Sequence, residues 1–493
     1  MNVVDKAIAV AFPGWAARRI ESRLLIEQYK AYDAAMPGKQ RKTKIRNVSG
    51  DTAIHGHAVS IRGQARYLDE NHDIVTGLLN TLEQKVVGPK GISIEPMPYT
   101  VAGEKAEDLA ADITRLFEEF SIAPDTTGEY SREEMERLSC RSWLRDGEMF
   151  GKHVFGNVPN FRHNTSIPFS IELLEADFLP FNKSDLDSRV YQGIERNNWG
   201  QALAYHFYKN HPGDMRGFEF ETVRVPAERV QHLKYTDRIR QGRGISILHA
   251  VITRLEDLKD YEESERVAAR ISAVLAAYIK KNGPAQGKQI NGERTFPIAP
   301  GIVYDGLQPN EDVGTIQSNR PSALLQPFRD SMLRAVASGT RGTFSTISGQ
   351  YDGTYSAQRQ EMVEGYAGYE TLQRMFISKW SKPIYRKFID ACIASGRIEI
   401  PADVVPESIY NALYFGPVMP WIDPDKESKG HERDVKAGFS TEAEVIRKKG
   451  QNPQEVKTQR QKEVQENEDK NLIFSSDARH EVNQPLPETS IKE

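Results

Sequence analysis

The feature that most constrains this chain is a single long helical pattern near its middle. The pattern runs from Ser246 to Lys281 without a break and stops at the Asn-Gly-Pro sequence that follows. Serine favours helix N-termini, whereas glycine followed by proline ends a helix. At 1.5 Å per residue its roughly 36 residues span about 54 Å, far more than an average globular helix. We therefore expect a strut that connects two separate bodies.

The expected strut changes character along its length. Its last third is small and apolar, with the run "VAARISAVLAA". A helix with a polar middle cannot be buried on all sides in one core, which is a second reason to expect a strut. The middle carries six acidic residues: Glu256, Asp257, Asp260, Glu262, Glu263 and Glu265.

The patterns on both sides of the strut are shorter and mixed. Helical spacing dominates before residue 148, and short strands separated by Pro, Gly and Asn follow over 150–235. This order predicts an α+β body. Beyond the strut we expect a strand-and-turn module at 283–320, a helix at 326–338, a helix at 356–395 with a kink at Pro383, two polar helices after Trp421, and a disordered tail beyond about residue 470.

A polar stretch, "TRGTFSTISGQYDGTYSAQRQ" at 340–360, separates two of these helices. It is rich in Gly, Ser, Thr and Tyr, and it contains Arg341, Arg359 and Asp352. Taken alone, this composition is typical of a solvated linker in which glycines free the backbone. An active-site loop and a loop held out for contact with a partner are the alternatives.

Composition excludes several classes of protein. The 65 basic and 69 acidic residues give a net charge of -4, so the chain is not a general nucleic-acid coat. No apolar run approaches the roughly 18 residues of a membrane span. The N-terminal apolar patch lacks a basic lead and a cleavage pattern, so we reject a signal peptide. Cys140 and Cys392 stand far apart and predict buried apolar residues in a reducing compartment.

Catalytic motifs are almost absent. The stretch "GPAQGKQ" at 283–289 is one residue short of a phosphate-binding loop and lacks its Ser or Thr. The pair His55 and His57 has no neighbours that would complete a metal site. Asp146, Glu148 and Lys152 resemble the carboxylates and lysine of a metal-dependent nuclease, but a helix-to-strand turn is the plainer interpretation. We predict no enzyme, no cofactor and no metal.

Five stretches, taken in order, are similar to the lambda-type portal proteins of tailed bacteriophages. They are "ARYLDENHDIVTGLLNTLEQKVVG" (65–88), "SWLRDGEMFGKHVF" (142–155), "VPAERVQHLKYTDRIRQGRGISIL" (225–248), "LRAVASGTRGTFSTISGQYDGTYSAQR" (333–359) and "WIDPDKESKGHERDVKAGFSTEAEVIRKKGQNPQEV" (421–456). One departure is Gln350 before Tyr351, where the family often has an Asp-Tyr pair.

The resemblance implies a ring of about twelve subunits at one capsid vertex, with a central channel for double-stranded DNA during packaging and ejection. It implies a structural α+β subunit located in the virion, and in the host cytoplasm during assembly. The implied partners are the large terminase subunit, the head–tail adaptor, the major capsid and scaffold proteins, and DNA without sequence preference, with no membrane. The implied parts are a wing (1–243 and 356–420), a stem helix (244–281), a small α/β clip (282–320), a second stem helix (321–342), a tunnel loop (343–355) and a helical crown with a disordered tail (421–493).

The same resemblance assigns roles to residues. A channel must contact DNA without trapping it, so short hydroxyl side chains and a tyrosine suit a tunnel loop, and acidic side chains on the stem would repel phosphates. The expected DNA-channel residues are Arg341, Thr343, Phe344, Ser345, Thr346, Ser348, Gln350, Tyr351 and Thr354. The expected docking residues of the clip are Lys288, Asn291, Glu293 and Arg294. The alternatives are a capsid shell or adaptor subunit and a metal-dependent nuclease.

Overall fold

The computed structural model describes Gly14 and residues 47–185, 187–214, 221–273, 277–281, 311–315, 324–419, 424–470 and 472. The chain divides into two units, Met1–Ala53 and Ile54–Glu493, and nearly all of the described residues belong to the second. Two expectations lie outside the described residues: the tail beyond residue 472 and the clip docking residues Lys288, Asn291, Glu293 and Arg294.

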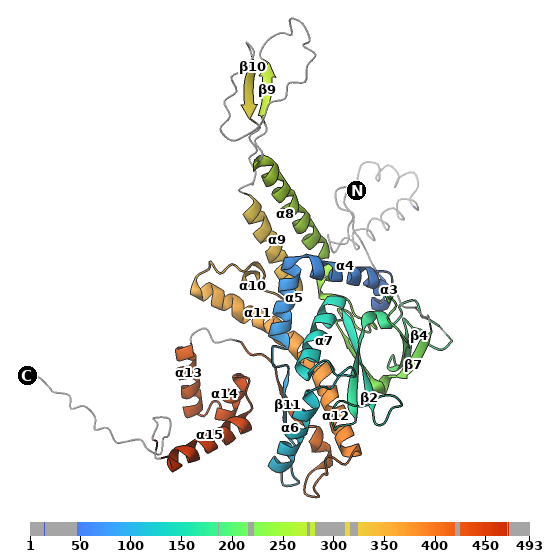
Figure 1. Cartoon of the computed structure of the whole chain (residues 1–493), viewed down its shortest axis with the longest axis vertical. Coiled ribbons are helices and arrows are strands. Elements are labelled where there is room, and N and C mark those ends of the chain that lie inside the picture. Colours follow the sequence, from blue (N-terminus) through green and yellow to red (C-terminus); the bar gives the residue numbers. More distant parts are fainter. Residues whose placement is uncertain are drawn as a thin grey trace, which may run out of the picture. The chain divides into compact units, whose positions relative to one another are not determined.

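Helices form the larger part of the body (Figure 1). Their bounds are α3 (Gly50–His55), α4 (Ala58–Asn71), α5 (Asp73–Val86), α6 (Glu107–Ser121) and α7 (Arg132–Asp146). The buried face of α6 has helical spacing, since Leu109, Ile113 and Leu116 are buried. A capping box joins Ser131 and Glu134 at the start of α7, where each side chain accepts a backbone N–H of the other residue.

The strands form small antiparallel sheets, which confirms the expected α+β class. One sheet has the order β3-β2-β8, with β2 (Glu148–Phe155), β3 (Phe169–Glu175) and β8 (Val230–Lys234). Another has the order β4-β5-β6-β7, with β4 (Val190–Tyr191), β5 (Ile194–Arg196), β6 (Ala202–Tyr208) and β7 (Thr222–Pro226). Strand β1 (Ser93–Pro96) pairs with β11 (Ala412–Phe415), which lies far along the chain.

The predicted long C-terminal helix is present, and its kink is a π-helical turn. Helix α11 (Tyr355–Phe376) passes through η6 (Ile377–Ser381) into α12 (Lys382–Ala394). Pro383 has no N–H to donate to the carbonyl of Lys379, and the side-chain amide of Gln231 on β8 donates to that carbonyl instead. Trp380 lies in this turn and is 1 % exposed, so the kink is buried in the main core.

The predicted strut is shorter than its sequence pattern. After the 3₁₀ turn η5 (Ile247–Ala250), helix α8 runs from Ile252 to Ala273, and residues 277–281 form strand β9, which pairs antiparallel with β10 (Glu311–Thr315). The prediction of a helix to residue 281 is therefore wrong. A short apolar run fits a strand as well as a helix, so periodicity alone could not place this boundary.

The second predicted helix of the strut is confirmed as α9 (Leu325–Thr340), which packs antiparallel against α8 (Figure 1). The Tyr261 and Phe328 rings lie 4.7 Å apart between centroids, and Arg329 Nε contacts Glu262 Oε1 at 2.9 Å. None of the helices in the described ranges is both long and apolar enough to span a membrane.

Three polar helices follow the body: α13 (Pro424–Lys436), α14 (Glu442–Lys448) and α15 (Pro453–Asp469). The two predicted polar helices are confirmed as α14 and α15, whereas α13 was not predicted. Arg447 on α14 makes two hydrogen bonds, at 3.1 and 3.2 Å, to the buried carboxylate of Glu95 on β1. This bidentate pair fixes α14 against the β1–β11 sheet.

Candidate functional site

The polar stretch between α9 and α11 has two halves with different structure. Helix α9 ends at Arg341, which adopts the left-handed conformation with φ 60°, and a short helix α10 (Phe344–Ser348) follows. Gly349, at φ 68°, ends α10, and the chain then runs to Thr354, whose hydroxyl caps α11. The expectation of a loop throughout 343–355 is therefore wrong for its first half.

The first half is anchored to the body. The ring of Phe344 lies 4.7 Å from the guanidinium of Arg334 on α9, and Ile347 packs against the main core. The hydroxyls of Thr343 and Thr346 are 2.5 Å apart. Ser345 is 8 % exposed and its N–H donates to Glu361 on α11 at 3.1 Å. Among the expected DNA-channel residues, those of α10 are thus mostly covered within the subunit.

The second half is exposed. Tyr351 and Tyr355 are 65 % and 54 % exposed, and Thr354 is exposed, whereas Ser348 and Gln350 are half-buried. We call residues 349–360 the exposed connector. Its two charged side chains, Asp352 and Arg359, are exposed and have no ion-pair partner among the described residues, and the same holds for Arg341 at the end of α9. These groups remain available for contacts outside the subunit.

The acidic residues of α8 do not form one exposed face. Glu265 is buried, Glu262 pairs with Arg329, and Glu256 is half-buried. Only three of the six acidic residues, Asp257, Asp260 and Glu263, are exposed. The expected acidic surface is therefore narrower than the sequence pattern, because helix α9 and the α4–α5 corner cover part of α8.

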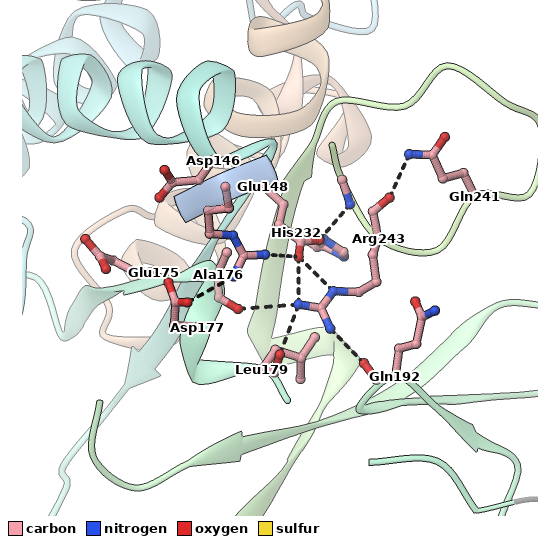
Figure 2. Close-up of polar contacts among 12 residues, drawn as sticks. Asp146, Glu148, Glu175, Ala176, Asp177, Leu179, Gln192, His232, Gln241 and Arg243 are labelled. Carbon is pink, nitrogen blue, oxygen red and sulfur yellow. Dashed lines mark hydrogen bonds and ion pairs between the residues drawn. The ribbon is translucent and has the colours of Figure 1, made fainter. Parts of the chain in front are cut away.

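A buried ion network lies at the base of α8 (Figure 2). Its centre is Glu148, the first residue of β2, whose carboxylate is fully buried. The carboxylate accepts hydrogen bonds from Arg243 Nε at 2.8 Å, Arg62 Nη2 at 3.3 Å, His232 Nε2 at 3.0 Å and the Gly244 N–H at 2.8 Å. Four donors from α4, β8 and the 241–244 loop therefore converge on one charge.

Arg243 is satisfied on every side. Its guanidinium also donates to the carbonyl oxygens of Gln192 at 2.9 Å, Leu179 at 3.0 Å and Ala176 at 3.4 Å. The ring of Phe181 covers its face at 3.8 Å. A buried charge is tolerated only when it is paired and hydrogen-bonded in this way.

The pKa values follow from this geometry. Burial alone would raise the pKa of Glu148, but Arg243 and the His232 contact outweigh it and hold that pKa well below its ordinary value. Burial lowers the pKa of His232 to about 4 although Glu148 opposes the shift. Glu148 is thus a carboxylate locked in its charged form rather than a proton donor or a free metal ligand.

The network extends outward through Arg66 on α4. Arg66 Nη2 contacts Asp146 Oδ2 at 2.7 Å and Asp177 Oδ2 at 2.6 Å. Glu175, Asp177 and His211 are the one group in the described ranges close enough together to hold a metal ion, but Asp177 already pairs with Arg62 and Arg66. The positive charges of these two arginines beside the Asp177 carboxylate disfavour the binding of a metal cation there.

The three residues of the nuclease alternative do not form one site, because each of them pairs with charged side chains of its own. Asp146 pairs with Arg66 and Arg145, Glu148 with Arg243 and Arg62, and Lys152 with Glu172 at 2.7 Å. A substrate that displaced the partners of Asp146 or Glu148 would leave buried charges unpaired. Of the two candidate metal-site histidines, His55 stacks on Tyr191 with centroids 6.3 Å apart, and His57 is exposed.

Sequence reasoning missed most of this network. Only Asp146 and Glu148 were considered, and for a different role. Arg243 lies in "QGRG" and Arg62 in an amphipathic helix, where both positions look solvated. A usable signal was Glu148 at the start of the mainly apolar strand "EMFGKHVF", because a buried charge in a strand needs a partner.

A second buried histidine, His153 on β2, is expected to make the stability of the fold sensitive to acid. Both ring nitrogens of His153 lack a hydrogen-bond partner among the described residues, and burial, with a smaller effect of Lys387, lowers its pKa to about 4. The unfolded chain binds this proton near pH 6.5, so the unfolding free energy falls as the pH drops from about 6.5 to 4, by about 3 kcal/mol for this group. His153→Phe should flatten that slope in urea unfolding at several pH values, whereas His57→Phe should leave it unchanged. An unchanged slope in His153→Phe would refute the assignment.

Taken together, these features favour a structural role. A buried network of carboxylates and arginines holds the segment that leads into the α8–α9 pair, and the connector between α10 and α11 is exposed. A family model described as phage portal protein, lambda family, matches residues 37–373. The chain belongs to the lambda family of phage portal proteins.

Named relatives agree with this family. The chain is 23 % identical over 426 residues to a probable portal protein of Halomonas phage phiHAP-1, covering 83 % of this chain and 80 % of the relative. It is 20 % identical over 308 residues to portal protein B of Escherichia phage lambda, covering 56 % of this chain and 58 % of that protein. A chain in the neck of an empty gene transfer agent particle is 14 % identical with a TM-score of 0.48, covering 80 % of this chain and 94 % of that one.

The predicted function is confirmed at the level of the family. Portal proteins are structural, non-enzymatic components of the virion that form a ring and provide the channel for DNA. The nuclease alternative is therefore wrong, and so is the capsid shell or adaptor alternative.

Proposed function

We propose that about twelve copies of this chain form a ring at one capsid vertex, and that the exposed connector, residues 349–360, is the part of each copy that contacts DNA in the channel. The observation that supports this is the contrast within the 340–360 stretch. Its first half is anchored by α10, and its second half presents Tyr351, Thr354 and Arg359 on the surface of the subunit. An anchored base with an exposed tip suits repeated contact with a moving polymer.

The side chains of the connector suit contact with DNA that does not bind it tightly. Each phosphate that a protein neutralises adds to affinity and to its salt dependence, so a channel needs few cations per subunit. The connector itself contains one arginine and one acid, Arg359 and Asp352, which balance each other. Tyrosine and hydroxyl side chains supply contacts that do not read sequence.

We assign roles to the other segments in the same way. The body is the wing, the α8–α9 pair is the stem, 282–320 is the clip and the helices after residue 421 are the crown. The exposed acids of α8, Asp257, Asp260 and Glu263, would repel phosphates from the stem where it faces the channel. Docking of the large terminase subunit and the head–tail adaptor falls to the clip, through Lys288, Asn291, Glu293 and Arg294, and the wing meets capsid and scaffold proteins in the host cytoplasm during assembly.

The ring is tested by negative-stain electron microscopy and mass photometry of the purified chain. We expect particles with a central hole and a mass of about twelve times 55.7 kDa. Closed shells, or small species at every concentration with and without scaffold, would contradict the proposal.

The role of the connector is tested by adding charge to it. Asp352→Lys should make rings hold double-stranded DNA more tightly and slow packaging, because the ring gains a cation per subunit at the channel, and the slope of log affinity against log salt should steepen by roughly one per new phosphate contact. Asp112→Lys on α6 makes the same change at an exposed site away from the connector. If both variants bind DNA alike, the connector does not face the channel.

A further inference from the structure

The C-terminal helices are attached to the rest of the chain without an apolar core. Helices α13, α14 and α15 form a segment that we call the C-terminal arm, residues 424–470 (Figure 1). Pro453 is the one buried residue among the described side chains of the arm. Neither of the two apolar clusters of the described residues includes a residue of the arm. Because apolar burial is the main source of stable attachment, polar contacts must hold the arm in place.

The arm meets the β1–β11 sheet at Glu95. This residue is 4 % exposed, and its carboxylate accepts two hydrogen bonds from Arg447 of α14, at 3.1 and 3.2 Å. Leu413 lies directly opposite Glu95 in the strand pairing, so both side chains are on the same face of the sheet. Leu413 is 37 % exposed, which means that the arm does not seal this face. The attachment at the sheet is therefore charged rather than apolar.

The arm also stands away from helix α6. A hollow of about 610 Å³ separates α6 from the first half of α15, and its lining is mainly charged and polar. Charged side chains on its two walls pair within their own helix or its cap. Arg115 of α6 contacts Asp112 at 3.4 Å, and Glu455 of α15 accepts from Asn452 at 3.1 Å. Packing therefore does not fix the arm against α6.

A second cation lies beside the Glu95 carboxylate. Lys105, which precedes α6, has its Nζ 3.7 Å from Glu95 Oε1 and 3.5 Å from Glu107 Oε2. The Glu107 side chain is 53 % exposed and can be left to water, whereas Glu95 is buried. Lys105 is thus placed to neutralise Glu95 if Arg447 leaves. Since a buried carboxylate loses its last partner at high cost, this exchange makes detachment of the arm easier.

We propose that the Arg447–Glu95 pair is a reversible latch, and that the C-terminal arm swings away from the β1–β11 sheet when this pair breaks. In the closed state Arg447 holds Glu95, and in the open state Lys105 takes its place. Salt favours the open state, because the Debye length falls from about 10 Å at 0.1 M to about 3 Å at 1 M. The arm lies outside residues 37–373, which the family model matches, so the latch does not follow from the family assignment.

The distance between α6 and α15 reports the state of the latch. Spin labels are attached to the full chain through Glu118→Cys and Gln459→Cys, two exposed positions that line the hollow, and are measured by pulsed electron spin resonance. The native cysteines, Cys140 and Cys392, are buried and stay unlabelled. Dilution with unlabelled chain removes distances between copies. We expect a short distance at low salt and a growing population of long distances toward about 1 M NaCl.

Three substitutions distinguish a latch from a passive contact. Arg447→Met should raise the ratio of open to closed arms roughly tenfold or more at low salt, the effect of losing a charge-assisted bidentate contact. Lys105→Met should lower that ratio roughly twofold to fivefold, because the cation that replaces Arg447 is gone. Lys448→Met is the matched control, since Lys448 pairs with Glu444 inside α14 and its loss should leave the ratio unchanged.

The opposite signs of the two cation removals decide the matter. A short distance in Arg447→Met at low salt, or an open arm in Lys105→Met, would overturn the latch. A distance in the unchanged chain that does not respond to salt would overturn it as well. Thermal unfolding of the Arg447→Met and Lys105→Met chains should stay close to that of the unchanged chain, because the arm adds no residue to the apolar clusters. A large loss of thermal stability in Arg447→Met would show that the pair belongs to the fold and is not a latch.

Discussion

Replacing Arg243 with methionine is expected to lower the unfolding free energy by about 3–5 kcal/mol, the usual cost of removing one partner of a buried ion pair. The cause is the Glu148 carboxylate, which stays charged and fully buried after its main partner is lost. Three backbone carbonyls, those of Gln192, Leu179 and Ala176, lose the hydrogen bond from this guanidinium at the same time. The change also frees the 241–244 loop that leads into η5 and α8, so ring assembly should fail at concentrations where the unchanged chain assembles.

Urea unfolding of the single and double variants measures this coupling. Arg243→Met combined with Glu148→Leu should recover part of the loss, because no uncompensated charge remains buried. Arg224→Met is the matched control: Arg224 makes a similar two-bond contact to Glu195, but at the surface, and its loss should change stability little. Equal effects of Arg243→Met and Arg224→Met would show that the network does not stabilise the fold.

The sequence was sufficient to predict features that follow a periodic pattern of apolar and polar residues. Helical spacing predicted the helix at 326–338, which is α9, and the mixed patterns predicted the α+β class. The end of α8 was not predictable, since residues 277–281 fit helix and strand equally until β10 pairs with them. Helix α10 was missed because its stability comes from Phe344 and Ile347 packing on distant elements, which local composition does not encode.

Only the part of the candidate site that lies within one continuous stretch of sequence could be predicted. The exposed connector follows from a run of Gly, Ser, Thr and Tyr between two helices. The buried network does not, because Arg62, Glu148, His232 and Arg243 come from four segments and meet only in the folded chain. Single charged residues in a sequence look solvated, and only the tertiary structure shows which of them are paired.

A single methyl group at Gly244 is expected to be as damaging as the loss of Arg243. The Cβ of an alanine there would overlap the carbonyl oxygen of Gly147, and backbone atoms cannot move aside as a side chain can. Gly147 is itself fixed, at φ 90° with the backbone of Ile245 beside it. Gly244→Ala should therefore lower the unfolding free energy by about 3 kcal/mol or more, at the upper end for overpacking.

The matched control for this prediction is Gly63→Ala in α4. Its Cβ meets nothing within 4 Å, and alanine in a helix interior should stabilise the chain by roughly 0.5–1 kcal/mol. Opposite signs for the same substitution would show that the 147–244 contact, not glycine in general, holds α8 to the body. The Gly244 N–H also donates to Glu148, so a displaced backbone weakens the ion network as well. If Gly244→Ala unfolds at the same urea concentration as the unchanged chain, the base of α8 is not a rigid junction.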